Sequence, residues 1–348
     1  MAACCKPSRD WSIVAYISYA NRFSRIALVS SSRLTLLPSG PTGLVLSIEI
    51  FGANGQDDIH YTPVSLTGHT RIFGAGSEDA IWVDLLPLVD PTRKFLDASG
   101  LPSSLVTGNE ATRPRDLVEL DGQGAGDTYE INLAGASDYI VRVLESGSVG
   151  DGNDTLTING TGSDDVFLLR EKFVALLRPT GFDAADRPVL PMNSEYERIN
   201  YDPAIESLKV TSGNGNDRFY VDDNSAVTTV VMGSGDDKFQ VGQLFGAARS
   251  IPDVAPGDEI ATVETTRGYL SRGISFTTTV LAGAGDDSMT VYGNQAALNL
   301  FGEADDDSIL VRAFLLVGDG TATGQTNVSG GSGQDLIQYN VNAPVALD

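Results

Sequence analysis

The sequence predicts an all-β fold in which the chain winds as a two-sided solenoid. Three observations predict it. A glycine–aspartate motif recurs along the chain, each copy runs on into a stretch where apolar residues alternate with other residues, and two pairs of neighbouring copies place their aspartates 20 residues apart. Self-similarity of this kind is typical of repeat proteins, in which each repeat buries its apolar face against the next.

The motif reads G-x-G-x-D-x-U-x-U, where U is an apolar residue. Six copies fit it strictly: GDGNDTLTI (150–158), GTGSDDVFL (160–168), GNGNDRFYV (213–221), GSGDDKFQV (233–241), GAGDDSMTV (283–291) and GSGQDLIQY (331–339). Four degenerate copies lack the first glycine or carry one extra residue before the aspartate: ANGQDDIHY (53–61), GAGSEDAIWV (74–83), GQGAGDTYEI (122–131) and GEADDDSILV (302–311).

Each half of the motif has a physical role. Glycine adopts positive φ and lets backbones approach closely, so the first half can turn tightly and point carbonyl groups inward. The aspartate adds a hard anionic oxygen, and Ca²⁺ in proteins takes about six to eight carboxylate and carbonyl oxygens. The last residues alternate with period two, as Phe219 and Val221 do. This alternation predicts a strand with one buried face.

The spacing of the aspartates predicts how the copies stack. Between Asp217 and Asp237 the sequence reads as a strand, a DDNSA turn, a second strand and a GSGDD turn, which is one full coil. Strands stack about 4.8 Å apart, so the second aspartate turn should lie over the first and leave a gap that fits a cation. Asp154 and Asp164 are only 10 residues apart, so we expect them on opposite edges of a coil.

These copies resemble the hemolysin-type (RTX) calcium-binding repeat, G-G-x-G-x-D-x-U-x. The resemblance extends over residues 46–348 and implies a parallel β-helix or β-roll that holds calcium between successive turns, in a secreted or cell-surface protein. Carried over copy by copy, it makes the aspartate of each motif a calcium ligand. These are Asp154, Asp164, Asp217, Asp237, Asp287 and Asp335 in the strict copies, and Asp57, Asp79, Asp127 and Asp307 in the degenerate copies.

The chain departs from long tandem arrays of this repeat. It carries inserts at 84–119, 169–208 and 242–276. In its scattered copies of the repeat it is similar to giant repetitive bacterial surface proteins. We therefore expect a part of a longer array. The inserts either form a recognition face or cover the sheet edges. We favour the second interpretation, in which they cover the edges. Within the second insert, LREKFVALLRP predicts a short helix that ends near Pro179.

Residues 1–45 form a separate N-terminal segment in this prediction. Lys6 and Arg9 precede a short apolar stretch, 11–20, which is either a weak secretory signal or an ordinary segment, and we favour the latter. No run of about 18 apolar residues exists, so we expect no helical membrane span.

Charge and composition exclude several classes of function. The net charge is -23, from 46 acidic and 23 basic residues, which disfavours nucleic acid and anionic membranes as partners. The only cysteines are the adjacent Cys4 and Cys5, and the only histidines are His60 and His69. A disulfide framework and a zinc site are therefore not expected.

An enzyme is the weaker prediction. Parallel β-helices host polysaccharide lyases and hydrolases that use carboxylates, but here nearly all carboxylates stand in the glycine turns. His60 should point outward from its strand and His69 lies in a polar turn, so neither suggests a catalytic triad. No HExxH or GxxxxGK[ST] motif occurs.

The sequence therefore predicts a right-handed parallel β-solenoid that binds calcium and serves a structural or adhesive role at the cell surface or outside the cell. Its expected partners are calcium ions, with surface polysaccharide or other surface proteins as further candidates. Two alternatives stay open. One is a carbohydrate-active β-helix enzyme, and the other is a metal-free solenoid in which each aspartate caps its glycine turn through backbone N–H groups.

Overall fold

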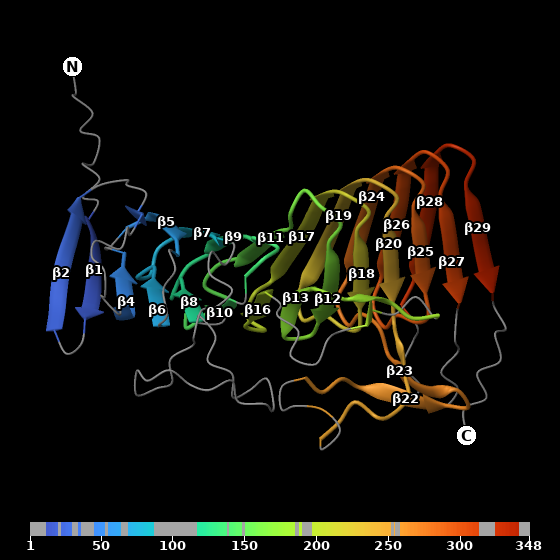
Figure 1. The fold of residues 1–348 in the computed structure, drawn as a ribbon, viewed down its shortest axis with the longest axis horizontal. Helices are drawn as coiled ribbons and strands as arrows, with labels where there is room; N and C mark the ends of the chain where they lie inside the picture. Colours follow the sequence, from blue (N-terminus) through green and yellow to red (C-terminus); the bar gives the residue numbers. More distant parts are fainter. Residues whose placement is uncertain are drawn as a thin grey trace.

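Figure 1 shows the fold of the chain in a computed structural model. The structure describes residues 12–19, 22–29, 34–35, 45–52, 55–63, 69–86, 117–137, 139–147, 150–184, 188–189, 197–251, 254, 258–312 and 324–340. Within these residues every regular element is a β-strand.

Two long sheets contain most of the strands. Sheet A has 14 strands in the order β2 (Arg22–Val29), β1 (Ser12–Tyr19), β4 (Val45–Phe51), β6 (His69–Phe73), β8 (Leu117–Asp121), β10 (Ile140–Leu144), β16 (Glu197–Tyr201), β13 (Phe173–Leu177), β12 (Val166–Arg170), β18 (Arg218–Val221), β20 (Lys238–Val241), β25 (Ser288–Val291), β27 (Ser308–Arg312) and β29 (Leu336–Asn340). Sheet B has 10 strands in the order β28 (Thr326–Ser332), β26 (Leu298–Ala304), β24 (Thr278–Ala284), β19 (Val227–Ser234), β17 (Ser207–Asn214), β11 (Thr155–Asn159), β9 (Thr128–Asn132), β7 (Ala80–Asp84), β5 (Asp58–Thr62) and β3 (Leu34–Thr35).

The chain passes back and forth between the two sheets, and most passes add one strand to each, although β12, β13 and β16 all join sheet A between β11 and β17 of sheet B. Most neighbours within a sheet are parallel, so that Arg218 pairs with Lys238 and Phe219 with Phe239, 20 residues further on. The exceptions are antiparallel pairings of β1 with β2 and β4, and of β13 with β12 and β16. The predicted all-β, parallel two-sided solenoid is confirmed.

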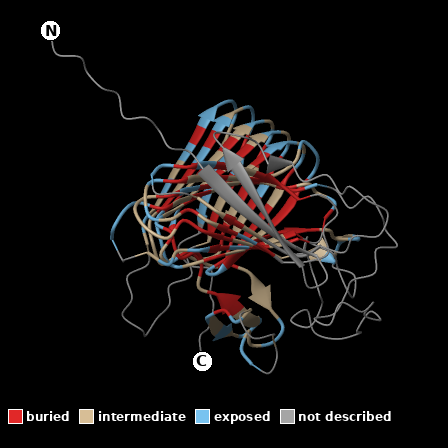
Figure 2. Ribbon diagram, turned by 90° about the vertical axis from the view of Figure 1, so that its left-hand side faces the viewer, coloured by how far each residue is buried: buried red, intermediate tan, exposed pale blue. Residues whose placement is uncertain are grey.

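The core lies between the two sheets, where the period-two alternation places its apolar residues (Figure 2). In β18, Phe219 and Val221 are buried, and Phe219 stacks on Phe167 of the neighbouring coil with ring centroids 4.7 Å apart. The same inward positions are apolar in almost every coil, so the core runs the length of the stack. Burial of one such side chain stabilises the fold by roughly 1.5–3 kcal/mol.

The helix predicted at LREKFVALLRP is wrong. β12 and β13 form an antiparallel hairpin there, which turns at Glu171 and Lys172. The sequence misleads because β13 is buried on both faces: Val174 faces the main core, whereas Phe173 belongs to a second apolar cluster outside it. Continuous burial removes the alternation that normally identifies a strand.

The inserts do not all lie outside the solenoid. Residues 169–208 contribute β13 and β16 to sheet A itself, together with a small hairpin of β14 (Gly181–Phe182) and β15 (Pro188–Val189). The insert at 242–276 forms a three-stranded sheet of β21 (Leu244–Phe245), β23 (Gly268–Ser271) and β22 (Thr262–Thr265). Most of 84–119 and of 1–45, including both cysteines, lies outside the described residues.

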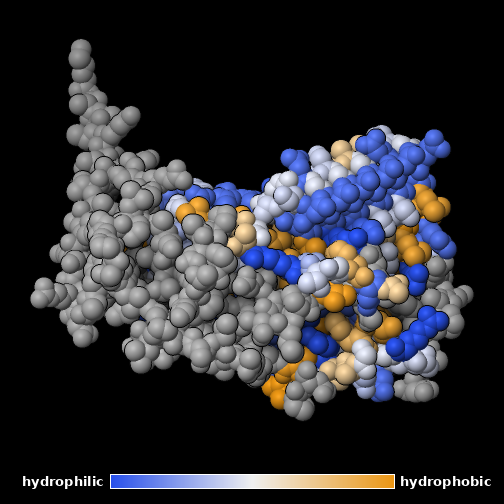
Figure 3. Space-filling model, viewed as in Figure 1, coloured by the Kyte–Doolittle hydropathy of each residue, from blue (hydrophilic) through white to orange (hydrophobic). Residues whose placement is uncertain are grey.

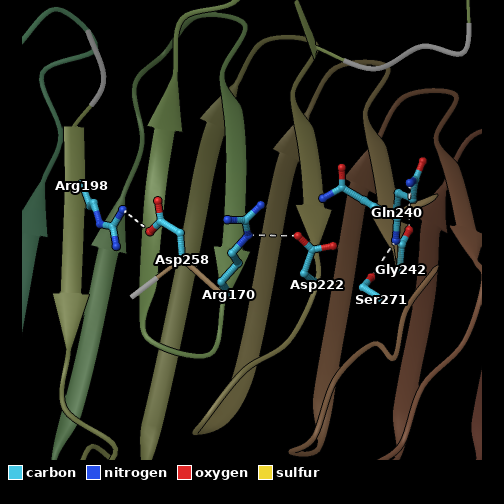
Figure 4. A network of polar contacts seen from close by, with 8 residues as sticks. Arg170, Arg198, Asp222, Gln240, Gly242, Asp258 and Ser271 are labelled. Carbon is cyan, nitrogen blue, oxygen red and sulfur yellow. Dashed lines mark hydrogen bonds and ion pairs between the residues drawn. The ribbon is translucent and has the colours of Figure 1, made fainter. Parts of the chain in front are cut away.

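One ion pair joins the insert at 242–276 to sheet A. Arg198 on β16 bonds to Asp258 at 2.8 Å, and Figure 4 shows the two side chains reaching toward each other. Next to them, Arg170 at the end of β12 bonds to the fully buried Asp222 at 3.1 Å. The ion pair between Arg198 and Asp258 joins the insert to β16, an interior strand of sheet A.

Candidate metal centre

A row of buried aspartates follows one edge of the C-terminal coils, at the turns that lead from sheet B into sheet A. The backbone N–H of each aspartate donates to Oδ1 of the aspartate one coil further on. The N···O distances are 2.7 Å for Asp165 to Asp217, 2.7 Å for Asp217 to Asp237, 2.8 Å for Asp237 to Asp287, 3.0 Å for Asp287 to Asp307 and 3.1 Å for Asp307 to Asp335. We call these residues the C-terminal row.

A second row runs along the opposite edge of the N-terminal coils, at turns that lead from sheet A into sheet B. The same N–H to carboxylate bonds join Asp57 to Asp79 (2.7 Å), Asp79 to Asp127 (2.7 Å), Asp127 to Asp154 (2.8 Å) and Asp154 to Glu206 (2.8 Å). We call these residues the N-terminal row. The acidic edge therefore switches sides at β11, between Asp154 and Asp165, so the motifs at 150–158 and 160–168 do lie on opposite edges.

Small residues at the start of the turns make room for the row carboxylates. A Cβ on Gly122 would come within 1.8 Å of Oδ2 of Asp127, and one on Gly302 within 2.0 Å of Oδ2 of Asp307. In both turns the glycine stands five residues before the aspartate, so the carboxylate occupies the space that a side chain would fill. The glycine and the aspartate of these turns are therefore one structural unit.

In most of the row aspartates the second carboxylate oxygen has no protein partner. Oδ2 is buried and accepts no hydrogen bond in six of them: Asp79, Asp127, Asp217, Asp237, Asp287 and Asp307. Burial, helped by the neighbouring carboxylates, raises the pKa values of Asp127, Asp237 and Asp287 to about 7 and those of Asp79 and Asp165 to about 6. An unpaired buried carboxylate is costly, and a proton or a cation removes that cost.

An outer row runs beside the C-terminal row, one residue earlier in each turn. Its bonds run the other way along the stack, because each side chain accepts from the N–H of the next coil. Its members are Asp164, Asn216, Asp236, Asp286, Asp306 and Gln334. Most are exposed, and Figure 3 shows a hydrophilic band along the C-terminal coils, toward the upper right of the view.

Nine of the ten aspartates predicted as ligands lie in the two buried rows, and Asp164 does not. The structure places Asp165 in the C-terminal row and Asp164 in the outer row. The strand register decides this, because Phe167 pairs with Phe219 and both rings face the core. The motif register of this copy is therefore corrected by one residue. Glycine then stands five residues before the aspartate, as in the copies at 74, 122 and 302.

One group of carboxylates is more compact than the rest. Asp127, Glu145 and Asp154 each offer an oxygen, and these oxygens lie within 4.8 Å of one another. Sequence reasoning included the two aspartates but missed Glu145, which belongs to no motif copy, and also Glu206, which ends the N-terminal row. The one available signal was the 27-residue interval between Asp127 and Asp154, which indicates a longer turn.

The chemistry of both rows suits a hard cation. The side chains of both rows offer carboxylate oxygens alone, and carboxylate and carbonyl oxygens are the ligands that Ca²⁺ prefers. The buried Oδ2 atoms without a partner fit such an ion. His60 takes no part, because it stacks on Trp82 on the outer face of sheet B, with centroids 4.2 Å apart. The side chain of His69 lies outside the described residues.

The described residues include no helix long and apolar enough to cross a membrane. Comparison of the chain with protein-family models, with curated proteins and with solved structures gave no match.

Proposed function

We propose that this chain is a calcium-binding structural or adhesive β-solenoid that works outside the cell, and that it is not an enzyme. The observation that carries the proposal is the stack of row aspartates whose buried Oδ2 atoms have no protein partner. Calcium between successive turns would pair with these oxygens and offset the repulsion along each row. The resemblance of the motif copies to the RTX repeat supports the same cation and an extracellular location.

The proposal makes calcium part of the folding free energy, because the sites exist only when the coils are stacked. Extracellular calcium modules bind with Kd values of about 10⁻⁴–10⁻³ M, so the chain would be loaded outside a cell and empty inside one. Each site held at calcium 100 times its Kd adds about 2.7 kcal/mol to the free energy of unfolding. Several sites together would decide whether the chain folds.

Circular dichroism tests this directly. With calcium at about 10 mM, above the expected Kd range, the chain should show a strong β signal and a cooperative thermal transition. With excess chelator the signal should weaken and the transition should move to markedly lower temperature. Magnesium at the same concentration controls for ionic strength and should restore little of the β signal or of the transition temperature. Identical spectra and melting curves with calcium and with chelator would count against the proposal.

A further inference from the structure

The compact group of Asp127, Glu145 and Asp154 is not built like the rest of the N-terminal row. Asp127 precedes β9 and Asp154 precedes β11, and both belong to the row. Glu145 comes from a third element, since it directly follows β10 of sheet A. Three carboxylates that come from the ends of three strands repel one another, so they can hold these strands together only if a positive charge balances them.

Glu145 occupies a position that is glycine in the neighbouring turns. Leu144 pairs with Asp121, so Glu145 lies opposite Gly122, the glycine that makes room for Asp127. The turn here is also longer: Asp154 stands nine positions after Glu145, whereas Asp127 stands five positions after Gly122.

Tyr129 fixes the orientation of the glutamate. Its ring is fully buried, and its hydroxyl accepts a bond from the Gly122 N–H at 2.7 Å and donates to Oε2 of Glu145 at 3.2 Å. The N–H of Gly147 donates to Oε1 of Glu145 at 2.8 Å. Both oxygens are therefore held by neutral donors.

In the part of the chain that the structure describes, no positive charge balances the three carboxylates. Asp127 is 0% exposed and its Oδ2 has no hydrogen-bond partner. That oxygen lies against Gly122, the residue opposite Glu145, and one oxygen of each of the three acids lies within 4.8 Å of the others. Among the described residues no lysine or arginine forms an ion pair with any of the three acids. Burial and the neighbouring acids raise the pKa of each carboxyl group.

We propose that Asp127, Glu145 and Asp154 form a discrete calcium site that fastens the long 145–154 turn to the coil below it. The site depends on the proposed function only for the identity of the cation. It differs from the sites expected along the rows because its third ligand is a side chain from the preceding strand end rather than the turn of a stacked motif.

Terbium, which replaces calcium in oxygen sites and emits when a nearby tyrosine is excited, can report on this site because the Tyr129 hydroxyl contacts Glu145. The wild-type chain should show tyrosine-sensitised terbium emission that calcium displaces. Tyr129→Phe should remove most of the emission while the number of bound ions stays the same. Glu145→Gln, which keeps the size of the side chain, should weaken the affinity behind this emission about tenfold or more.

Asp236→Asn, in the exposed outer row on the opposite edge of the stack, is the control and should leave the emission unchanged. Circular dichroism in calcium shows whether each variant is folded. Emission that is absent from the folded wild type, or unchanged in Glu145→Gln or Tyr129→Phe, would overturn the site and leave the rows untouched. One terbium per chain with the expected responses would support this site and contradict the rows.

Discussion

Asp237→Asn is expected to remove calcium-dependent stability from the C-terminal coils. Oδ1 of Asp237 accepts the N–H of Asp217 at 2.7 Å, and its own N–H donates to Asp287 at 2.8 Å. Asparagine keeps the acceptor and the shape but loses the charge. If a cation lies in the row, the variant loses at least one site, which is worth about 2.7 kcal/mol at calcium 100 times Kd. Chemical denaturation in calcium and in chelator measures the difference.

Asp236→Asn is the matched control for this variant. Asp236 stands one residue earlier, in the exposed outer row, where Asn216 already fills the equivalent place one coil back. Its effect should therefore be small in either condition. The capping alternative predicts the reverse for Asp237→Asn, because loss of a buried charge would leave stability unchanged or increase it. Equal stability of the Asp237 variant and wild type in calcium would favour capping.

Acid is expected to stabilise the metal-free chain, which is unusual for a protein rich in carboxylates. Burial raises the pKa values of Asp127, Asp237 and Asp287 from 3.8 to about 7 in the folded chain. Between these limits the folded state binds more protons than the unfolded state, so the free energy of unfolding falls as pH rises.

Calcium should reverse this dependence, because it binds the deprotonated carboxylates and competes with protons. The measurement is a set of denaturation curves between pH 4 and pH 8, on metal-stripped protein and on protein in excess calcium. The free energy of unfolding of the metal-free protein should decrease from pH 4 to pH 8. The difference in free energy of unfolding between the calcium-loaded and the metal-free protein should increase over the same range. Metal-free stability that increases toward pH 8 would show that the row carboxylates are not buried as described.

Most of the fold could be predicted because each motif copy indicates both a turn and the strand that follows it. The glycines mark the turns, and alternating pairs such as Phe219 and Val221 mark the strands. The 20-residue interval fixes how Asp217 and Asp237 stack. The same reasoning failed where local pattern and tertiary register diverge. GTGSDD offers two adjacent aspartates, and only the stacking of Phe167 on Phe219 selects Asp165.

Other residues could not be predicted because their roles depend on contacts distant in sequence. Glu206 continues the N-terminal row from 52 residues away, at a turn without the glycine motif. Glu145 lies close to Asp127, which stands 18 positions earlier in the sequence and belongs to the preceding coil. The hairpin of β12 and β13 depends on a second apolar cluster outside the main core, which no periodicity in its own sequence indicates.

The number of calcium ions bound per chain tests the central claim most directly. Equilibrium dialysis of the folded chain at millimolar calcium, followed by metal analysis, gives this number without reference to spectra. If buried carboxylates of stacked coils hold cations on both edges, at least two ions should bind per chain, and fewer should bind to Asp237→Asn. A folded chain that retains no calcium at this concentration would contradict the account.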